Sequence, residues 1–318
     1  MDRRDAEAIL ARIAPRRALF HYFKDRYALV LLALAAHDGR SLSELRSGSL
    51  GRLFRKRIVA DLERRKNGRP LELGDLWSVW PAERECYVLT LGIWGHRSGH
   101  CAWYQTSRRG YNLVLQLNYP SKHDRAYSRL IRPGRTDPWV NRQHPIREKG
   151  RRTMSWSRID LDLAHGEALI EEVQNDWIRE AVSDVEAICS PTDAKARRRR
   201  LENLLWDTSC TVESLKEYVE SVLAPHRRIW AEATLTAAVW FLREDVGIRS
   251  IWYHTHTTGC LVKKIRYRRP PISLYEQLPR RFGFERVRGC PRFLEEQRGR
   301  SMRGLRRHNT AEFWRLRL

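Results

Sequence analysis

The sequence predicts an α/β protein in which a mixed central sheet carries helices on both faces. Apolar residues recur at helical spacing through residues 1–80, whereas from residue 85 they alternate with polar residues as strands do. An acidic strand end near residue 172 is then followed by a long apolar helix, a strand, a helix and two closing strands. With 318 residues and 42% hydrophobic content, the chain can bury the core of such a sheet.

Residues 1–80 are expected to form a helical N-terminal region. Helices are predicted over Arg17–His37 and from Leu53 to about Lys66, and Ser41 with Glu44 forms a capping box between them. A helix-turn-helix is the alternative interpretation of this segment. Because many small basic helical bundles show the same pattern, we favour a scaffold role for this segment over a DNA-binding role.

Residues 81–318 are expected to form the α/β domain. Four antiparallel strands are predicted first, over Cys86–Trp94, Tyr111–Tyr119, Met154–Asp162 and 166–174, and the polar stretch Pro120–Arg152 is expected to be irregular. The third and fourth of these strands pair through a short turn.

A basic helical insertion is predicted at about 178–226, ended by Pro225. The remaining elements are an apolar helix over Arg228–Asp245, a strand over Ile248–Thr255, a helix from Pro271 to Gly283 and two closing strands. Because strand–helix–strand units are right-handed, the strands that contain Glu172 and Ile251 should be parallel neighbours.

The net charge of +22, carried by 60 Lys and Arg, favours a polyanionic partner such as RNA or DNA. A high-GC genome, which encodes Arg in place of Lys, explains the choice of Arg but not the excess of positive over negative charge. The candidates for nucleic-acid contact are exposed-looking arginines, namely Arg108, Arg109, Arg197, Arg198, Arg199 and Arg200.

The segment Trp94–Arg109 interleaves Trp, Tyr and Arg, which is typical of single-strand binders and equally typical of a hairpin core. The six cysteines form no C-x-x-C pair, so we expect reduced thiols. The N-terminus has no signal-peptide core, and the longest apolar run, Ala28–Ala36, is too short for a bilayer. We therefore expect a cytoplasmic protein without a membrane partner; the sequence does not indicate the oligomeric state.

The acidic strand end reads GEALIEEVQNDW, residues 166–177. Regular alternation would place Glu172, Gln174 and Asp176 on one face and Glu171 on the other. Acid and amide groups at the carboxyl end of a central strand are typical of α/β active sites. The alternative is a strand end that reaches solvent, with both Glu paired to surface Arg.

The order of these elements resembles the GNAT superfamily of acyl-CoA N-acyltransferases, and the closest local likeness is PPISLYEQLPRRFGFERV near the C-terminus. The resemblance implies a general base at Glu171 or Glu172 and a general acid at Tyr275, with acyl-CoA as donor. The chain departs from the family by lacking a Gly-rich pyrophosphate turn. In its place Arg227 and Arg228 stand near a predicted helix N-terminus, where they could bind phosphate.

Gln174 and Asn175 are the further candidates for cofactor contact, because they follow the candidate base directly. LIEEVQNDW is also similar to the E-I-Q-S-D-W strand end of uncharacterised phage and bacterial proteins, which implies no activity. The predicted parallel pairing places His254 beside Glu172, so that both would enter one cleft with Tyr275.

Two clusters contain side chains that can bind a metal ion. The stronger candidate is His254, His256 and Cys260, and the weaker one is His96, His100 and Cys101. We expect no metal, since neither cluster has a clear fourth ligand. The leading functional hypothesis is acyl or aminoacyl transfer onto an amine, carried by a nucleic acid or another anionic substrate. The main alternative is a non-catalytic nucleic-acid-binding protein on a GNAT-like scaffold, and a third is a structural component of a phage-related assembly.

Overall fold

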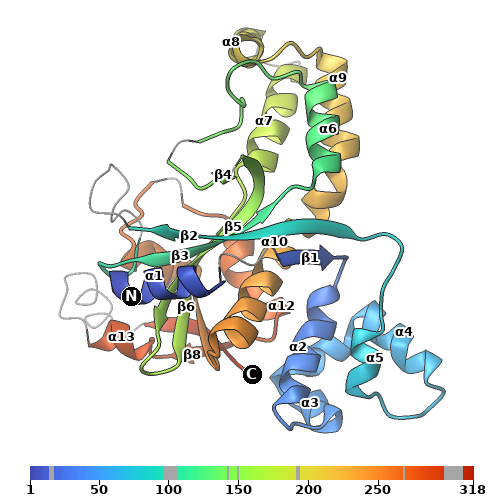
Figure 1. Cartoon of the computed structure of the whole chain (residues 1–318), viewed down its shortest axis with the longest axis vertical. Helices are drawn as coiled ribbons and strands as arrows, with labels where there is room; N and C mark the ends of the chain where they lie inside the picture. The colour runs from blue at the N-terminus through green and yellow to red at the C-terminus, as the bar shows by residue number, and fades with distance from the viewer. Residues whose placement is uncertain are drawn as a thin grey trace.

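The computed structural model describes residues 1–13, 18–95, 106–141, 143–148, 150–190, 194–267, 269–296 and 311–318. These residues form one mixed sheet that crosses the middle of the molecule, with helices on both faces (Figure 1). Helices α6 to α9 form a lobe above the sheet, and α2 to α5 form a second lobe at its lower right. The predicted α/β class is confirmed.

The strands are β1 (Ala18–Tyr22), β2 (Glu85–Trp94), β3 (Asn112–Asn118), β4 (Arg147–Glu148), β5 (Arg151–Asp162), β6 (Glu167–Gln174), β7 (Ser250–His254), β8 (Glu285–Arg288) and β9 (Glu312–Arg317). Their order across the sheet is β1-β2-β3-β5-β6-β7-β9-β8, and β4 pairs with β5 outside this path. The β6–β7 pair is parallel, and the other pairs are antiparallel.

The helical elements before the acidic strand are α1 (Arg3–Ile13), α2 (Arg26–His37), α3 (Leu42–Ser47), the 3₁₀ turn η1 (Ser49–Arg55), α4 (Arg57–Arg65), α5 (Leu73–Trp77) and α6 (Ser121–Leu130). Those after it are α7 (Trp177–Cys189), α8 (Ala194–Asp207), α9 (Val212–Glu217), α10 (Ala224–Trp240), α11 (His256–Val262), α12 (Leu278–Arg281) and α13 (Arg292–Glu295), with π-helical turns η2 (Tyr218–Val222), η3 (Phe241–Val246) and η4 (Ser273–Gln277).

The predicted parallel pair of strands is confirmed, since Ala168 of β6 lies opposite Ile251 of β7 and α10 connects the two strands. The β5–β6 hairpin and the closing pair β8–β9 are confirmed as well. So is the capping box, in which the side chain of Ser41 accepts from Glu44 N and the carboxylate of Glu44 accepts from Ser41 N.

Three local predictions are wrong. The first part of the helix predicted over Arg17–His37 is the edge strand β1, because Phe20 and Tyr22 alternate into the core and pair with β2. Residues 120–130, expected to be irregular, contain α6. Pro225 does not end the helix that precedes it, because the π-helical turn η2 and a bend at Leu223 place this proline in the first turn of α10.

The regular alternation predicted for the acidic strand is also wrong, because β6 carries a bulge. Arg158 of β5 lies opposite Glu172, and the next residue, Ile159, lies opposite Ile170, so Glu171 has no partner in the register. A bulge of this kind shifts the alternation by one residue. Ile170 packs into the core beneath α10. Because of the bulge, Glu172 does not share this face and lies with Glu171 on the other one.

The two faces of β6 have separate apolar cores. Ala168 and Ile170 belong to the large core that α10 covers, whereas Leu169 packs in a smaller cluster with Val262 of α11 and Phe293 of α13. The buried charges described below lie on the second face, at the end of this smaller cluster. Among the described residues, no helix has both the length and the apolar character needed to cross a bilayer.

Candidate functional site

The chemistry-bearing side chains gather where β6 and β7 stop pairing. Their parallel register ends at Ile170 and Tyr253, so the next residues, Glu171 and His254, stand at the point where the strands separate. The sequence predicted His254 beside Glu172, whereas the structure places His254 against Glu171 and adds Ser107 and Lys263 from distant parts of the chain. These four residues and the pair Arg158–Glu172 are called the buried charge network below.

The carboxylate of Glu171 accepts hydrogen bonds from three directions. Ser107 N donates to Oε1 at 2.9 Å, Ser107 Oγ donates to Oε2 at 2.8 Å, and His254 Nε2 lies 3.1 Å from the same Oε2. Glu171 and His254 are fully buried and Ser107 nearly so. A neutral His254 with its proton on Nε2 satisfies this arrangement, and its Nδ1 then has no hydrogen-bond partner among the described residues.

These three side chains do not form a nucleophilic triad. In a triad the acid binds one imidazole nitrogen and the serine the other, so that a proton can pass through the ring. Here Ser107 Oγ, at 2.9 Å, and the Glu171 carboxylate both approach the same atom, His254 Nε2. The hydroxyl of Ser107 is therefore bonded to an acid and is not activated by a base.

Lys263 and Tyr275 occupy the gap between the separated strands. Lys263 Nζ donates to the main-chain oxygen of Glu171 at 2.5 Å and lies 3.3 Å from the hydroxyl of Tyr275. Tyr275 Oη is 3.5 Å from the same Glu171 oxygen. A buried amine and a phenol thus satisfy a strand-end carbonyl that has no neighbouring strand to bind it.

The expectation that Glu172 lies free at the bottom of a cleft is wrong. Its carboxylate accepts from Arg158 Nη2 at 2.8 Å, and Arg158 is 1% exposed. The cause is the bulge, which places Glu172 directly opposite Arg158 on β5. A carboxylate held by a buried guanidinium is neutralised and is poorly suited to accept a substrate proton.

The pKa shifts agree with a structural network of fixed charges. Burial acts to raise the pKa of the Glu171 carboxyl, but the hydrogen bond from His254 and the charges of Lys263 and Arg158 lower it to about 2. Burial lowers the pKa of His254 and of Lys263 and raises that of the Tyr275 hydroxyl well above its ordinary value. Glu171 is therefore a stable anion and a weak base.

The amides predicted to contact a cofactor are used inside the protein. Asn175 Nδ2 donates to Met154 O at 2.7 Å, and its Oδ1 accepts from Ile178 N at 2.9 Å in the first turn of α7. Gln174 Nε2 donates to Asp176 Oδ1 at 2.6 Å. Asn175 thus acts as a helix cap, and neither amide presents a free group to a ligand through these atoms.

Arg227 and Arg228 are exposed, but they do not stand at an open helix N-terminus. The chain is already helical through α9 and η2, and Arg227 N donates to Leu223 O at 2.8 Å. Because Pro225 has no N–H and that of Arg227 is bonded, the set of free amides expected for phosphate binding is not formed there.

The two histidines of H-T-H-T-T-G-C have different partners. His254 ends β7 and bonds Glu171, whereas His256 begins α11 and its Nε2 donates to Pro270 O at 3.1 Å. Within the ranges that the structure describes, no group of three His, Cys, Asp or Glu is placed to hold a metal ion. The second cluster, His96, His100 and Cys101, lies outside the described residues, and so do Trp103 and Tyr104 of the segment Trp94–Arg109, whereas Trp94 ends β2.

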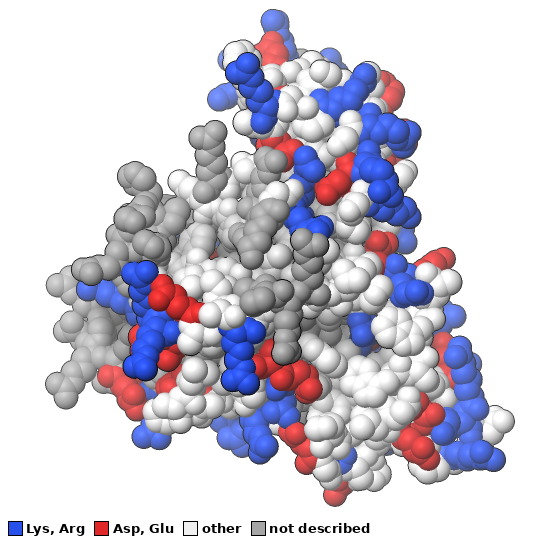
Figure 2. Space-filling view, in the orientation of Figure 1, with Lys and Arg blue, Asp and Glu red and all other residues white. Residues whose placement is uncertain are grey.

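The predicted helical insertion is not basic as a whole. Residues 178–226 contain seven basic and nine acidic residues, a net charge of −2. Within α8, Arg198 pairs with Glu202 at 2.8 Å and Arg200 with Asp184 at 2.7 Å, while Arg197 and Arg199 are exposed. Figure 2 shows acidic side chains between the basic ones on this upper lobe.

Of the two arginines before β3, Arg108 forms a bidentate ion pair with buried Asp160, with distances of 2.6 and 2.9 Å, whereas Arg109 is exposed.

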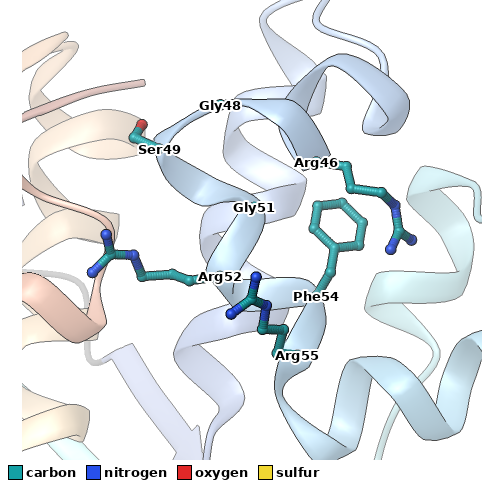
Figure 3. Close-up of a pocket in the computed structure, with 7 residues that line it drawn as sticks. All are labelled: Arg46, Gly48, Ser49, Gly51, Arg52, Phe54 and Arg55. Carbon is teal, nitrogen blue, oxygen red and sulfur yellow. The ribbon is translucent and has the colours of Figure 1, made fainter.

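An open surface hollow of about 680 Å³ lies over η1, lined by Arg46, Gly48, Ser49, Gly51, Arg52, Phe54 and Arg55. Its arginines do not converge: Figure 3 shows Arg46 beside Phe54 and Arg52 pointing the other way, toward its acceptor Arg280 O.

Comparisons were made with protein-family models, curated proteins and solved structures. None of them matches this chain. The GNAT resemblance therefore stays a prediction, supported by the parallel β6–β7 pair and its connecting helix but not by a relative.

Proposed function

We propose that the protein binds nucleic acid, and that the surface which does so is formed by its N-terminal and C-terminal parts. The observation that supports this most directly is the distribution of charge. Residues 1–80 carry 17 basic and 10 acidic residues, and residues 229–318 carry 19 and 8. These two parts thus account for most of the net charge of +22.

The two basic parts lie against one another in space. Tyr27 of α2 stacks on Phe282 with ring centroids 4.3 Å apart, and Arg52 of η1 donates to Arg280 O at 2.8 Å. Near this contact the charges of both parts act on the same region of the molecule, which suits a long polyanion better than a small ligand. Arginine predominates among them, and its planar guanidinium binds phosphate oxygens in pairs.

Acyl or aminoacyl transfer is supported less well. The ionisable groups at the separation of β6 and β7 favour it, because such groups often mark active sites. Against it stand the ion pair of Glu172 with Arg158 and the low pKa of Glu171, about 2. The bonded amide of Arg227 also weakens the case for acyl-CoA as a cofactor.

The proposal is tested by measuring the affinity of the whole chain for labelled RNA and DNA over a series of salt concentrations. We expect binding that weakens steeply as salt rises, because each neutralised phosphate releases about 0.7 to 0.9 counterions. Labelled acetyl-CoA in the same assay should not bind. Absence of nucleic-acid binding at low salt would show that the positive charge serves another partner.

A further inference from the structure

Besides the arginines of α8, the chain has a second basic run, which begins directly after Lys263 of the buried charge network. Residues 264–269, called the basic loop, read KIRYRR and connect α11 to the segment before η4. The side chains of Lys264, Arg266 and Arg269 are exposed, and Tyr267 is 86% exposed. The surrounding sequence, residues 246–275, contains no Asp or Glu.

Three basic side chains of the basic loop are not paired with an acid in the part of the chain that the structure describes. Lys264, Arg266 and Arg269 form no ion pair with any residue that the structure describes. In α8, by contrast, Arg198 and Arg200 are paired with acids. The charges of these three residues are therefore available to an external anion.

Both ends of the basic loop are fastened. On one side, Lys263 Nζ donates to Glu171 O at 2.5 Å, and Ile265 N donates to Cys260 O at 2.8 Å. On the other side, the carbonyl oxygen of Pro270 accepts from His256 Nε2 at 3.1 Å. Between these anchors Arg266 and Tyr267 point into solvent.

We infer that the basic loop binds single-stranded nucleic acid, with Tyr267 stacking on a base and its neighbours Lys264, Arg266 and Arg269 contacting phosphates. This inference rests on the proposed nucleic-acid function and names the element that carries it. An exposed ring between cations suits a single strand, because the bases of a duplex are already stacked on one another and are not free to accept a side chain.

The first test compares aromatic side chains of nearly equal exposure, since Trp206 of α8 is 88% exposed. Fluorescence anisotropy with a labelled oligothymidylate and oligouridylate of about 20 nucleotides and with a matching duplex measures the affinity. Tyr267→Ala should raise the single-strand Kd about fivefold or more, whereas Tyr267→Phe and Trp206→Ala should stay within about twofold of the unchanged protein.

The second test removes two positive charges from the basic loop and, as a control, two from α8. The double variant Lys264→Gln, Arg266→Gln should reduce the slope of log K against log salt by about 1.4, and Arg197→Gln, Arg199→Gln should leave it nearly unchanged. All four residues are exposed, so circular dichroism should show that both variants fold.

The outcomes separate the inference from the proposed function. No binding by the unchanged protein overturns both. Binding that resists changes in the basic loop, or that depends on Trp206 and Arg197 instead, overturns the inference and keeps the function. Equal affinity for the duplex overturns the single-strand assignment.

Discussion

Lys263 and Lys264 are neighbours in the chain, yet they belong to regions with opposite electrostatics. Lys263 is 6% exposed and lies in the buried charge network, where its ammonium binds a main-chain oxygen. Lys264 is exposed and begins the basic loop, and it forms no ion pair with any described residue. One region fixes its charges inside the protein and the other presents them to solvent.

The difference between the two regions indicates which charges are available for function. In the buried charge network, Glu171 accepts from Ser107 and His254, and Glu172 from Arg158. Removing one partner there leaves a buried charge without compensation, which is costly. In the basic loop a substitution costs little stability, because the side chains are already hydrated. The network should therefore respond in stability and the basic loop in binding.

The largest effect is expected from Glu171→Ala. This change leaves His254 and Ser107 without their common acceptor, and we expect the free energy of unfolding to fall by about 3–5 kcal/mol. Denaturant unfolding measures the loss. Below the transition, where the variant is folded, its affinity for oligothymidylate should be unchanged. A loss no larger than that of a surface pair, about 1 kcal/mol or less, would show that the network is not the rigid structure described above.

A smaller effect is expected on acidification. Because the folded pKa of Glu171, about 2, lies below its ordinary 4.5, its contribution to stability is present above pH 4.5 and is lost as the pH falls toward 2. Burial lowers the pKa of His254 below its ordinary 6.5, so as the pH falls the imidazole is protonated in the unfolded state before it is protonated in the folded state. The free energy of unfolding therefore also decreases below pH 6.5.

Unfolding measured from pH 7 to pH 3 should show this decline, and Glu171→Gln should remove most of the part below pH 4.5. The matched control is Glu202→Gln in α8, whose carboxylate is exposed and pairs only at the surface with Arg198. Equal pH profiles for the two variants would argue against a lowered pKa at Glu171.

The smallest effects should come from the neighbouring lysines, each changed to Met. Lys263→Met removes the donor to Glu171 O, and we expect a loss of about 1–3 kcal/mol in stability. Lys264→Met should change stability by less than about 0.5 kcal/mol, and it should lower the salt slope of single-strand binding by about 0.7. The opposite pattern, in which only Lys263→Met weakens binding at unchanged stability, would place the ligand in the gap between β6 and β7.

Much of the fold could be predicted because it depends on local pattern and handedness. The β5–β6 hairpin, the parallel neighbours β6 and β7, and the helix between them follow from alternation, periodicity and the crossover rule. The bulge at Glu171 could not be predicted, since alternation assumes one residue on each strand per pair. That single extra residue moved Glu172 to the face of Glu171 and placed it opposite its partner Arg158.

The candidate site was only partly predictable. The adjacency of the two strands was predicted, but His254 was expected beside Glu172, and the structure places it against Glu171. Ser107 and Lys263 reach Glu171 from 64 and 92 residues away, and a lone serine or a lysine after a helix gives no signal of such a contact. The four arginines of α8 predicted a basic insertion, although the nine acidic residues of the same segment outnumber its seven basic ones.

Fastening the basic loop at Lys263 and at Pro270 has a thermodynamic consequence for any ligand that it binds. A free peptide of this composition would lose conformational entropy on binding single-stranded nucleic acid, and that loss would weaken its affinity. Here much of the ordering of the backbone has taken place during folding. The few contacts made by Tyr267 and its neighbours can then appear more fully as affinity, which is the advantage of preorganisation.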